Sequence, residues 1–171
     1  MLFRLGEETK KAGHDMTDEI ADLDRTDHRL LAELSADARL SVAELARRVG
    51  LSKTPVQARL KRLEDSGVIR GYRALLDPVR LGLDNVAFVE VKLSDTREKA
   101  LRAFNDAVAA VPEVEECHMI AGAFDYLLKV RTRDMTRYRF VLGEKISSLP
   151  HVAHSSTHVV MQAVKDAGIV N

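Results

Sequence analysis

The sequence predicts an α+β protein in two parts, the first made only of helices and the second of alternating strands and helices. Two patterns support this prediction. Between residues 23 and 66, apolar residues recur every three or four positions, as they do along one face of a helix. From residue 85 onward, short apolar runs typical of strands are separated by two further stretches with helical spacing.

Charge is balanced over the whole chain but not along it. The 26 basic and 26 acidic residues give a formal net charge of zero. Residues 41–73 carry eight basic and three acidic side chains, a balance of +5, whereas residues 1–40 carry six and ten, a balance of −4. A basic block in a neutral chain is typical of a nucleic-acid contact, although charge alone is explained more often by a solvated helix face.

Composition excludes several classes of protein. Cys117 is the only cysteine, so neither an intramolecular disulfide nor a cysteine-rich zinc site is expected. No apolar run approaches the roughly eighteen residues of a membrane-spanning helix, and charged residues interrupt the apolar N-terminus, unlike a signal peptide. These features predict a soluble cytoplasmic protein with no membrane partner. Residues 1–20 are expected to form a flexible extension, with a short extra helix as the alternative, and residues 166–171 a tail.

Three helices are predicted within residues 21–67. The first begins after Asp24, which is a favourable N-cap residue. Ser41 and Glu44 have the spacing of a capping box, in which the serine accepts from the backbone of residue 44 and the glutamate reaches back to the backbone of residue 41. A second helix therefore begins there. It is expected to end at Gly50, because glycine tolerates a left-handed backbone.

The third helix follows the second after a very short turn. Only one residue separates Gly50 from Ser52, the expected cap of the third helix, and Pro55 is tolerated in a first helical turn. Two helices joined in this way, the second with a basic outer face, form a helix-turn-helix that can place its second helix in the major groove of DNA. The apolar stripe expected to face the core consists of Val56, Leu60 and Leu63.

The outer face of the third helix carries side chains suited to DNA. Gln57 can make paired hydrogen bonds to an adenine edge, Ala58 can contact a thymine methyl group, and Lys61 can reach a guanine or a phosphate. Neighbouring basic residues are better placed for phosphates, which fix the register of the protein on DNA without reading its sequence. The candidate DNA-binding residues are Ser52, Lys53, Thr54, Gln57, Ala58, Arg59, Lys61 and Arg62, of which Lys53, Arg59 and Arg62 are assigned to phosphates.

The second part has the pattern of a ferredoxin-like domain. Residues 68–75 read as a strand within a connecting segment of residues 68–84. The domain itself covers residues 85–165, and its order of strand, helix, strand, strand, helix, strand predicts an antiparallel sheet with both helices on one face. The other face needs a cover, which predicts a homodimer. The expected strands span residues 85–93, 115–121, 126–131 and 152–164, and the expected helices residues 97–110 and 134–147.

Ordered blocks of residues along the chain match one protein family. In the first part these blocks are residues 23–27, 49–52, 59–64 and 67–72, and in the second part residues 116–119, 122, 124–129 and 159–161. With these blocks the chain resembles the Lrp/AsnC, or feast-or-famine, family of transcriptional regulators over about residues 22–165. The resemblance implies a winged-type helix-turn-helix domain at residues 21–67, followed by an amino-acid-sensing and oligomerisation domain at residues 85–165.

The resemblance also implies an amino-acid effector and a place for it. The second part is most similar to family members that respond to leucine or proline. In the family, the turn at residues 122–125 lies at a contact between dimers; taken alone, it would be interpreted as an ordinary hairpin turn. Gly122 offers backbone amides to a carboxylate and Asp125 an anion to an ammonium group, whereas Ala123 replaces an acidic residue usual in the leucine-responsive type. The implied effector-binding residues are Met119, Gly122, Ala123, Asp125, Tyr126, Thr157, His158 and Val159.

No catalytic or metal-binding arrangement is predicted. His154 and His158 share a strand face, but four residues of strand place them about 13 Å apart, too far for one ion. Cys117 and His118 are adjacent in a strand, so their side chains point to opposite faces and cannot form a nucleophile and base. The sequence therefore predicts a protein that is not an enzyme and binds no cofactor.

The implied function is that of a sequence-specific regulator of amino-acid metabolism. Its expected partners are double-stranded DNA, a small amino acid such as proline or leucine, and copies of itself, as a homodimer that assembles into a tetramer or octamer. One alternative is an amino-acid-binding regulatory subunit that acts through protein contacts, since ferredoxin-like sensors also control enzymes. Another is an architectural DNA-binding protein without an effector. The basic helix favours the regulator over the regulatory subunit.

Overall fold

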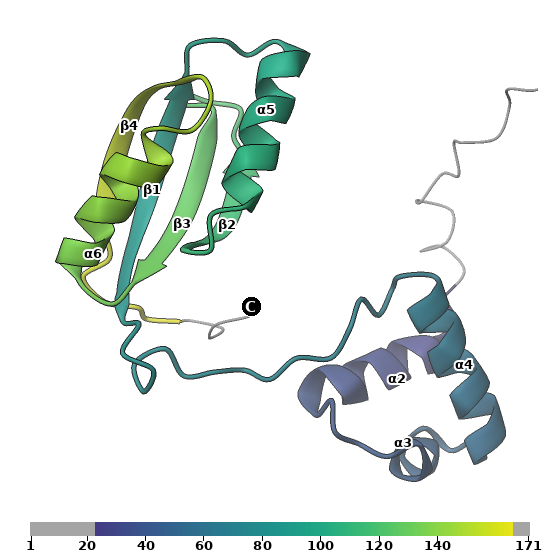
Figure 1. The fold of residues 1–171 in the computed structure, drawn as a ribbon. Helices are drawn as coiled ribbons and strands as arrows, with labels where there is room; N and C mark the ends of the chain where they lie inside the picture. The colour runs from purple at the N-terminus through teal and green to yellow at the C-terminus, as the bar shows by residue number, and fades with distance from the viewer. Residues whose placement is uncertain (1–22, 166–171) are drawn as a thin grey trace, which may run out of the picture. The chain divides into compact units, whose positions relative to one another are not determined.

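The computed structural model describes residues 23–165, which form two compact units divided between Arg73 and Ala74 (Figure 1). The expectations of an N-terminal extension at residues 1–20 and a tail at residues 166–171 lie outside the described residues. No helix of the described part is long and apolar enough to cross a membrane.

The first unit consists of three helices, α2 (Arg25–Ala36), α3 (Val42–Val49) and α4 (Lys53–Asp65). Asp24 caps α2, as expected, and forms a capping box with Asp27 that the sequence analysis did not identify. Gly50 ends α3 with a left-handed backbone at φ +75°, which confirms the predicted turn. The three helices enclose one apolar core, which consists of Leu30, Leu45, Ala46, Val49, Val56 and Leu60.

Two local expectations for the first unit are wrong. Ser41 accepts a hydrogen bond from the amide of Glu44, but the Glu44 carboxylate does not complete a capping box because it binds Arg47 and Arg48. The segment 68–75 forms no strand. A strand is stable only beside a partner that accepts and donates its backbone hydrogen bonds, and Ile69 instead donates its amide to Leu63 at the end of α4 and packs on the helical core.

The second unit has the expected order of elements. These are β1 (Asn85–Leu93), α5 (Glu98–Ala109), β2 (Val114–Met119), β3 (Tyr126–Thr132), α6 (Met135–Phe140), the π-helical turn η1 (Val141–Ile146) and β4 (Val152–Val159). All paired strands are antiparallel and their order in the sheet is β2-β3-β1-β4. Figure 1 shows α5 and α6 on the same face of this sheet. The predicted α+β class and ferredoxin-like pattern are therefore confirmed.

The sheet has one buried face and one open face because side chains alternate along each strand. Ala87, Val89 and Val91 of β1 are fully buried beneath the helices, whereas Phe88 and Lys92, at alternate positions of the same strand, are exposed. The expected last strand was too long, since β4 ends at Val159. Its partner β1 begins at Asn85; Val159 pairs with Ala87 and the amide of Val160 donates to Val86, so β1 offers almost no backbone to the residues that follow.

Candidate functional site: the outer face of α4 and the β2–β3 turn

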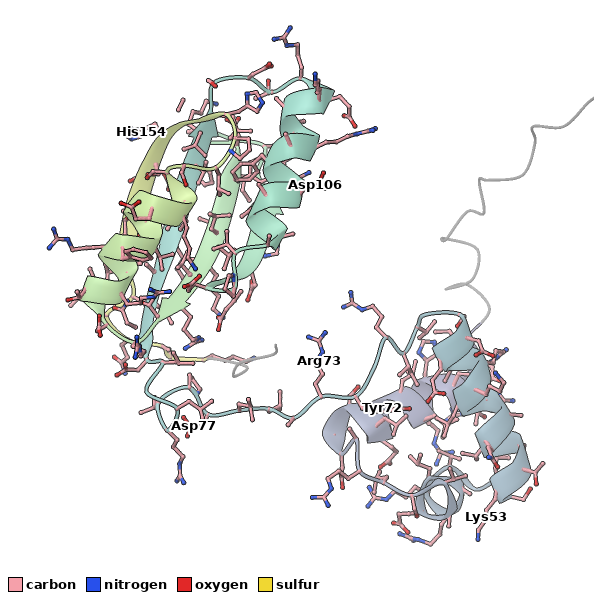
Figure 2. The ribbon with its side chains drawn as sticks, viewed as in Figure 1. Lys53, Tyr72, Arg73, Asp77, Asp106 and His154 are labelled. Atoms are coloured by element: carbon pink, nitrogen blue, oxygen red, sulfur yellow. The ribbon has the colours of Figure 1, made fainter. Side chains whose placement is uncertain are left out.

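The helix α4 has one buried side and one exposed side. Val56, Leu60 and Leu63 are buried against the other two helices. On the opposite side Thr54, Gln57, Ala58 and Lys61 are all exposed, at positions i, i+3, i+4 and i+7 of the same helix. Lys53 lies at the first turn of α4, beyond the short turn that follows α3 (Figure 2). Five of the eight predicted DNA-binding residues are therefore brought onto one exposed surface.

The turn between α3 and α4 is held from two sides. The amide of Leu51 donates to the carbonyl of Ala46 across Gly50, which closes the end of α3. The guanidinium of Arg29, on α2, donates to the last carbonyls of α3. The distances are 2.7 Å to the carbonyl of Arg48 and 3.3 Å to that of Val49. A cation at the C-terminal end of a helix also faces the negative end of its dipole. These contacts hold the end of α3 and the one-residue turn that leads into α4.

Ser52, another predicted contact, is the N-cap residue of α4 but its hydroxyl makes no capping hydrogen bond. The side chain is exposed. Amides in the first turn of a helix have no acceptor within the helix and favour a negatively charged group. The hydroxyl of Ser52 and these amides are thus arranged as a group of donors at the start of α4, a suitable place for a DNA phosphate.

Arg59 and Arg62, predicted to bind phosphates, are held by carboxylates of α2. Nη1 of Arg59 lies 2.8 Å from Oδ1 of Asp27 and 2.6 Å from Oδ2 of Asp24. Nη2 of Arg62 donates to Oδ2 of Asp27. The Asp27 side chain is fully buried, whereas the side chains of Arg59 and Arg62 are 29% and 50% exposed. We call these four residues, Asp24, Asp27, Arg59 and Arg62, the aspartate–arginine cluster.

The cluster keeps the Asp27 carboxylate charged. Burial alone would raise the pKa of Asp27, but hydrogen bonds from Arg59, from the amide of Asp24 and from Arg62 lower the pKa below its ordinary value. This cluster was not predicted from the sequence. Its signal was available, since two aspartates at the start of α2 precede two arginines three residues apart on a later helix.

Lys61, on the exposed face of α4, has an ion-pair partner on the same helix. Its ammonium group lies 2.7 Å from Asp65, one helical turn later. The two side chains are 74% and 62% exposed, and ion pairs this exposed contribute little to stability because water and salt screen them. Lys61 can therefore exchange this partner for a base edge or a phosphate at little cost.

The predicted effector-binding residues fall into two groups. Met119 and Tyr126 pair with each other across β2 and β3, and the turn of residues 120–125 joins these strands. Thr157, His158 and Val159 lie on β4. Because β2 and β4 are the opposite edges of the sheet, three strand spacings, or about 14 Å, separate Met119 from the β4 group. One chain does not bring the two groups together.

Asp125 closes the end of β1. Its Oδ2 accepts from the amide of Leu93 at 2.7 Å and its Oδ1 from the ammonium group of Lys92 at 3.1 Å. The hydrogen bond from the amide of Leu93 is the main cause that lowers the pKa of Asp125; burial opposes it, and Lys92 lowers the pKa further. Gly122 and Ala123 are exposed in the turn before it. Asp125 is thus a charged carboxylate with one half-exposed partner, Lys92, beside an exposed glycine turn.

The other effector candidates face different sides of the sheet. Tyr126 is 2% exposed, and its ring packs against Phe104 in the helix-side core. Thr157 contacts the same side, since its hydroxyl lies 2.6 Å from that of Tyr138. His158 points to the open face, with Nε2 3.2 Å from Glu90. Met119 and Val159 are 58% and 46% exposed. Within residues 23–165, no group of three or more His, Cys, Asp or Glu side chains is arranged to hold a metal ion.

Comparison with known proteins identifies both units. Residues 23–70 match the family model described as winged helix-turn-helix DNA-binding, and residues 86–170 match the Lrp/AsnC ligand binding domain. The proline dehydrogenase transcriptional activator of Rhizobium radiobacter is 67% identical over 148 residues, which are 86% of this chain and 95% of that protein. The chain belongs to the Lrp/AsnC family.

Other Lrp/AsnC proteins agree with this result. The leucine-responsive regulatory protein of Escherichia coli strain K12 is 47% identical over 85% of this chain and 89% of its own length. A transcriptional regulator from Neisseria meningitidis, solved in complex with L-Met, superimposes with a TM-score of 0.78 at 34% identity, covering 87% of this chain and 96% of that one. The predicted family, its similarity to a leucine-responsive regulatory protein and a proline dehydrogenase activator, and the winged helix-turn-helix class are confirmed. These relatives are transcriptional regulators rather than enzymes.

Proposed function

We propose that this Lrp/AsnC protein regulates genes of amino-acid metabolism by binding specific DNA sequences through α4. The observation that carries the proposal is the stripe of Thr54, Gln57, Ala58 and Lys61, which is exposed on a helix whose start is fixed by a short turn. In this assignment residues 21–67 are the DNA-binding domain, residues 68–84 the linker and residues 85–165 the sensing and oligomerisation domain. The protein acts in the cytoplasm, where the DNA is.

Proline is the first effector to test and leucine the second. The order follows identity, since the relative at 67% identity is named a proline dehydrogenase activator and the relative at 47% a leucine-responsive protein. Asp125 supplies the anion for the ammonium group by releasing Lys92, and the exposed turn at Gly122 supplies amides for the carboxylate.

The effector site is proposed to lie between copies of the chain. Met119 and Thr157 stand at opposite edges of the sheet, so a site that uses both groups of residues needs the β2–β3 turn of one copy and β4 of another. The open sheet face, which includes Phe88 and Lys92, is proposed to be covered in a homodimer, and the edge contacts to join dimers into a tetramer or octamer. Analytical ultracentrifugation tests this: a monomer at micromolar concentration contradicts it.

The proposed function is tested by fluorescence anisotropy with a labelled duplex from the upstream region of the protein's own gene. Titrations at two salt concentrations, with and without proline or leucine, are compared with those of a random duplex. Binding that is specific, falls steeply with salt and shifts with one amino acid supports the proposal. If the protein does not prefer the upstream duplex over random DNA, duplexes that it binds are selected from a random pool. A chain that enriches no sequence in either experiment, but binds an amino acid, is a regulatory subunit acting through protein contacts.

Two variants separate base reading from phosphate binding. Gln57→Ala is expected to lower affinity for the preferred duplex by about tenfold and leave random DNA unaffected, since a paired contact to a base contributes about 1–3 kcal/mol. Lys53→Ala, the matched control at the start of the same helix, is expected to weaken binding to both duplexes equally. Equal losses in both variants would contradict base reading by Gln57.

A further inference from the structure

The aspartate–arginine cluster links α4 to the start of α2, and its two arginines occupy different positions on α4. Arg59 lies one turn before the buried Leu63, at the boundary with the core. Arg62 lies one turn after the exposed Ala58, at the boundary with the proposed DNA-facing stripe. Their exposures follow this order, at 29% for Arg59 and 50% for Arg62.

The hydrogen bonds distinguish the arginines further. Nη1 of Arg59 is shared between the Asp24 and Asp27 carboxylates, so this side chain is turned inward onto α2. Among the described residues, Arg62 makes its ion pair through Nη2 alone, to Asp27. A guanidinium carries five N–H donors in a planar fork. The buried Asp27 carboxylate therefore orients the Arg62 guanidinium through Nη2. The other N–H donors of this half-exposed side chain remain accessible.

The Asp27 carboxylate cannot readily move away from this arrangement. It is fully buried, and Oδ2 also accepts from the amide of Asp24 at 3.1 Å as part of the α2 capping box. A buried charge without partners is very unfavourable, so the arginines must stay near it. The capped end of α2 thus acts as the fixed point against which the side chains of α4 are set.

Resting on the proposed function, we propose that Asp27 is a positioning residue for DNA recognition. Its carboxylate orients Arg62 so that the free edge of the guanidinium meets a phosphate beside the stripe of α4. It also holds Arg59 as an internal link between α2 and α4, which makes no contact with DNA. The two arginines, which carry the same charge on the same helix, then have different roles.

The test compares salt dependence in the full-length protein. The probe is a labelled duplex selected from a random pool by the wild-type protein, with random DNA as reference. Arg62→Gln is expected to reduce the slope of log affinity against log salt by about 0.9, the value of one phosphate contact. Arg59→Gln is expected to leave that slope unchanged. Arg62→Lys, which keeps the charge, is expected to retain most of the slope.

Asp27→Asn tests the positioning role directly, with Asp65→Asn as the matched control. Both substitutions remove one negative charge close to α4, but Asp65 is 62% exposed and binds only Lys61. Asp27→Asn is expected to lower affinity for the selected duplex by about tenfold and to reduce the salt slope as Arg62→Gln does. Asp65→Asn is expected to do neither.

Several results would overturn the inference. An Asp27→Asn protein that binds like Asp65→Asn, or more tightly than the wild type, would show that Asp27 does not orient Arg62 or merely competes with DNA for it. Equal slope losses for Arg59→Gln and Arg62→Gln would assign both arginines to phosphates. Thermal unfolding checks that each variant is folded. If Asp27→Asn is not folded, the salt slopes of Arg59→Gln and Arg62→Gln decide whether the two arginines have different roles. A wild-type protein that selects no sequence instead contradicts the proposed function itself.

Discussion

Each unit of the molecule encloses one carboxylate between two cations from a later helical segment, but the two clusters differ in depth. In the first unit Asp27 is fully buried and belongs to the capping box of α2. In the second, Glu113 is 13% exposed and caps no helix. It accepts from Arg137 of α6 at 2.6 Å and from Lys145 of η1 at 2.7 Å. In both units one carboxylate accepts from two cationic side chains. In the first unit this carboxylate also takes part in capping a helix, and in the second it does not.

This difference suggests that the two clusters contribute unequally to stability. Loss of Asp27 removes a buried ion pair, a capping hydrogen bond and the link between α2 and α4. Loss of Glu113 removes only the link between the segment before β2 and the helix covering the sheet. The following substitutions test that ranking, from the largest expected effect to the smallest.

Asp27→Ala is expected to lower the free energy of unfolding of the first unit by about 2 kcal/mol. Breaking a buried ion pair costs about 3–5 kcal/mol, and the exposure of the arginines reduces this because water can solvate them. Urea unfolding followed by circular dichroism measures the change. Asp65→Ala, which removes an exposed partner on α4, should cost less than about 0.5 kcal/mol. Equal losses would remove any special role of the buried carboxylate.

Glu113→Ala is expected to lower the stability of the second unit by about 1 kcal/mol, since Arg137 and Lys145 are 37% and 29% exposed and are solvated when released. The same urea experiment measures it. Glu98→Ala, whose ion pair with Arg102 is fully on the surface, serves as control with a cost below about 0.5 kcal/mol. A larger loss for Glu113→Ala than for Asp27→Ala would reverse the comparison.

Two glycines are expected to respond in opposite directions. Gly50 has φ +75°, so Gly50→Ala should destabilise the first unit by about 1 kcal/mol. Gly143 lies within η1 without a positive φ, and an added Cβ would meet no atom within 4 Å. Gly143→Ala should therefore stabilise the second unit by about 0.5 kcal/mol. Thermal unfolding of both variants measures the signs, and destabilisation by Gly143→Ala would indicate that the π-helical turn needs glycine.

The smallest effect is expected from mild acid. Burial raises the pKa of Asp27 and of Glu113, but their cationic partners outweigh it and the pKa of each is lowered. Because each pKa is lower in the folded than in the unfolded protein, each carboxylate stabilises the fold. This contribution is complete above about pH 4, the ordinary pKa range of carboxylates, and is lost as pH falls through the folded pKa. Melting temperature should therefore change little between pH 7 and 5 and fall below about pH 4. Asp27→Asn should flatten that fall more than Asp65→Asn.

Much of the fold was accessible from the sequence because it depends on local features. The cap at Asp24, the glycine turn at Gly50 and the exposed stripe of α4 follow from short-range geometry, and the structure reproduces them. The prediction of a strand at residues 68–75 was wrong because a strand needs a partner strand, which apolar spacing does not reveal. The end of β4 failed for the same reason, since it is set by where β1 begins.

The roles of charged residues were less accessible. Arg59, Arg62 and Glu44 were assigned from their own helices, yet each is bound to a partner chosen by tertiary packing or by competing arginines. Likewise, the family resemblance grouped Met119 and Thr157 in one effector site at a contact between dimers, and only the strand order shows that within one chain the width of the sheet separates them. The charge pattern of the sequence identifies residues that form ion pairs, but the tertiary packing determines the partner of each.

The separation of those sheet edges has a consequence for sensitivity. On the proposed assignment, an effector that contacts both the β2–β3 turn and β4 also joins two chains. Its apparent affinity then depends on how much protein is present, because ligand binding and assembly are thermodynamically linked. Such a molecule does not measure the amino acid alone. It compares the supply of the amino acid with its own abundance, so a change in its expression would shift the threshold of the response without any change in the binding residues.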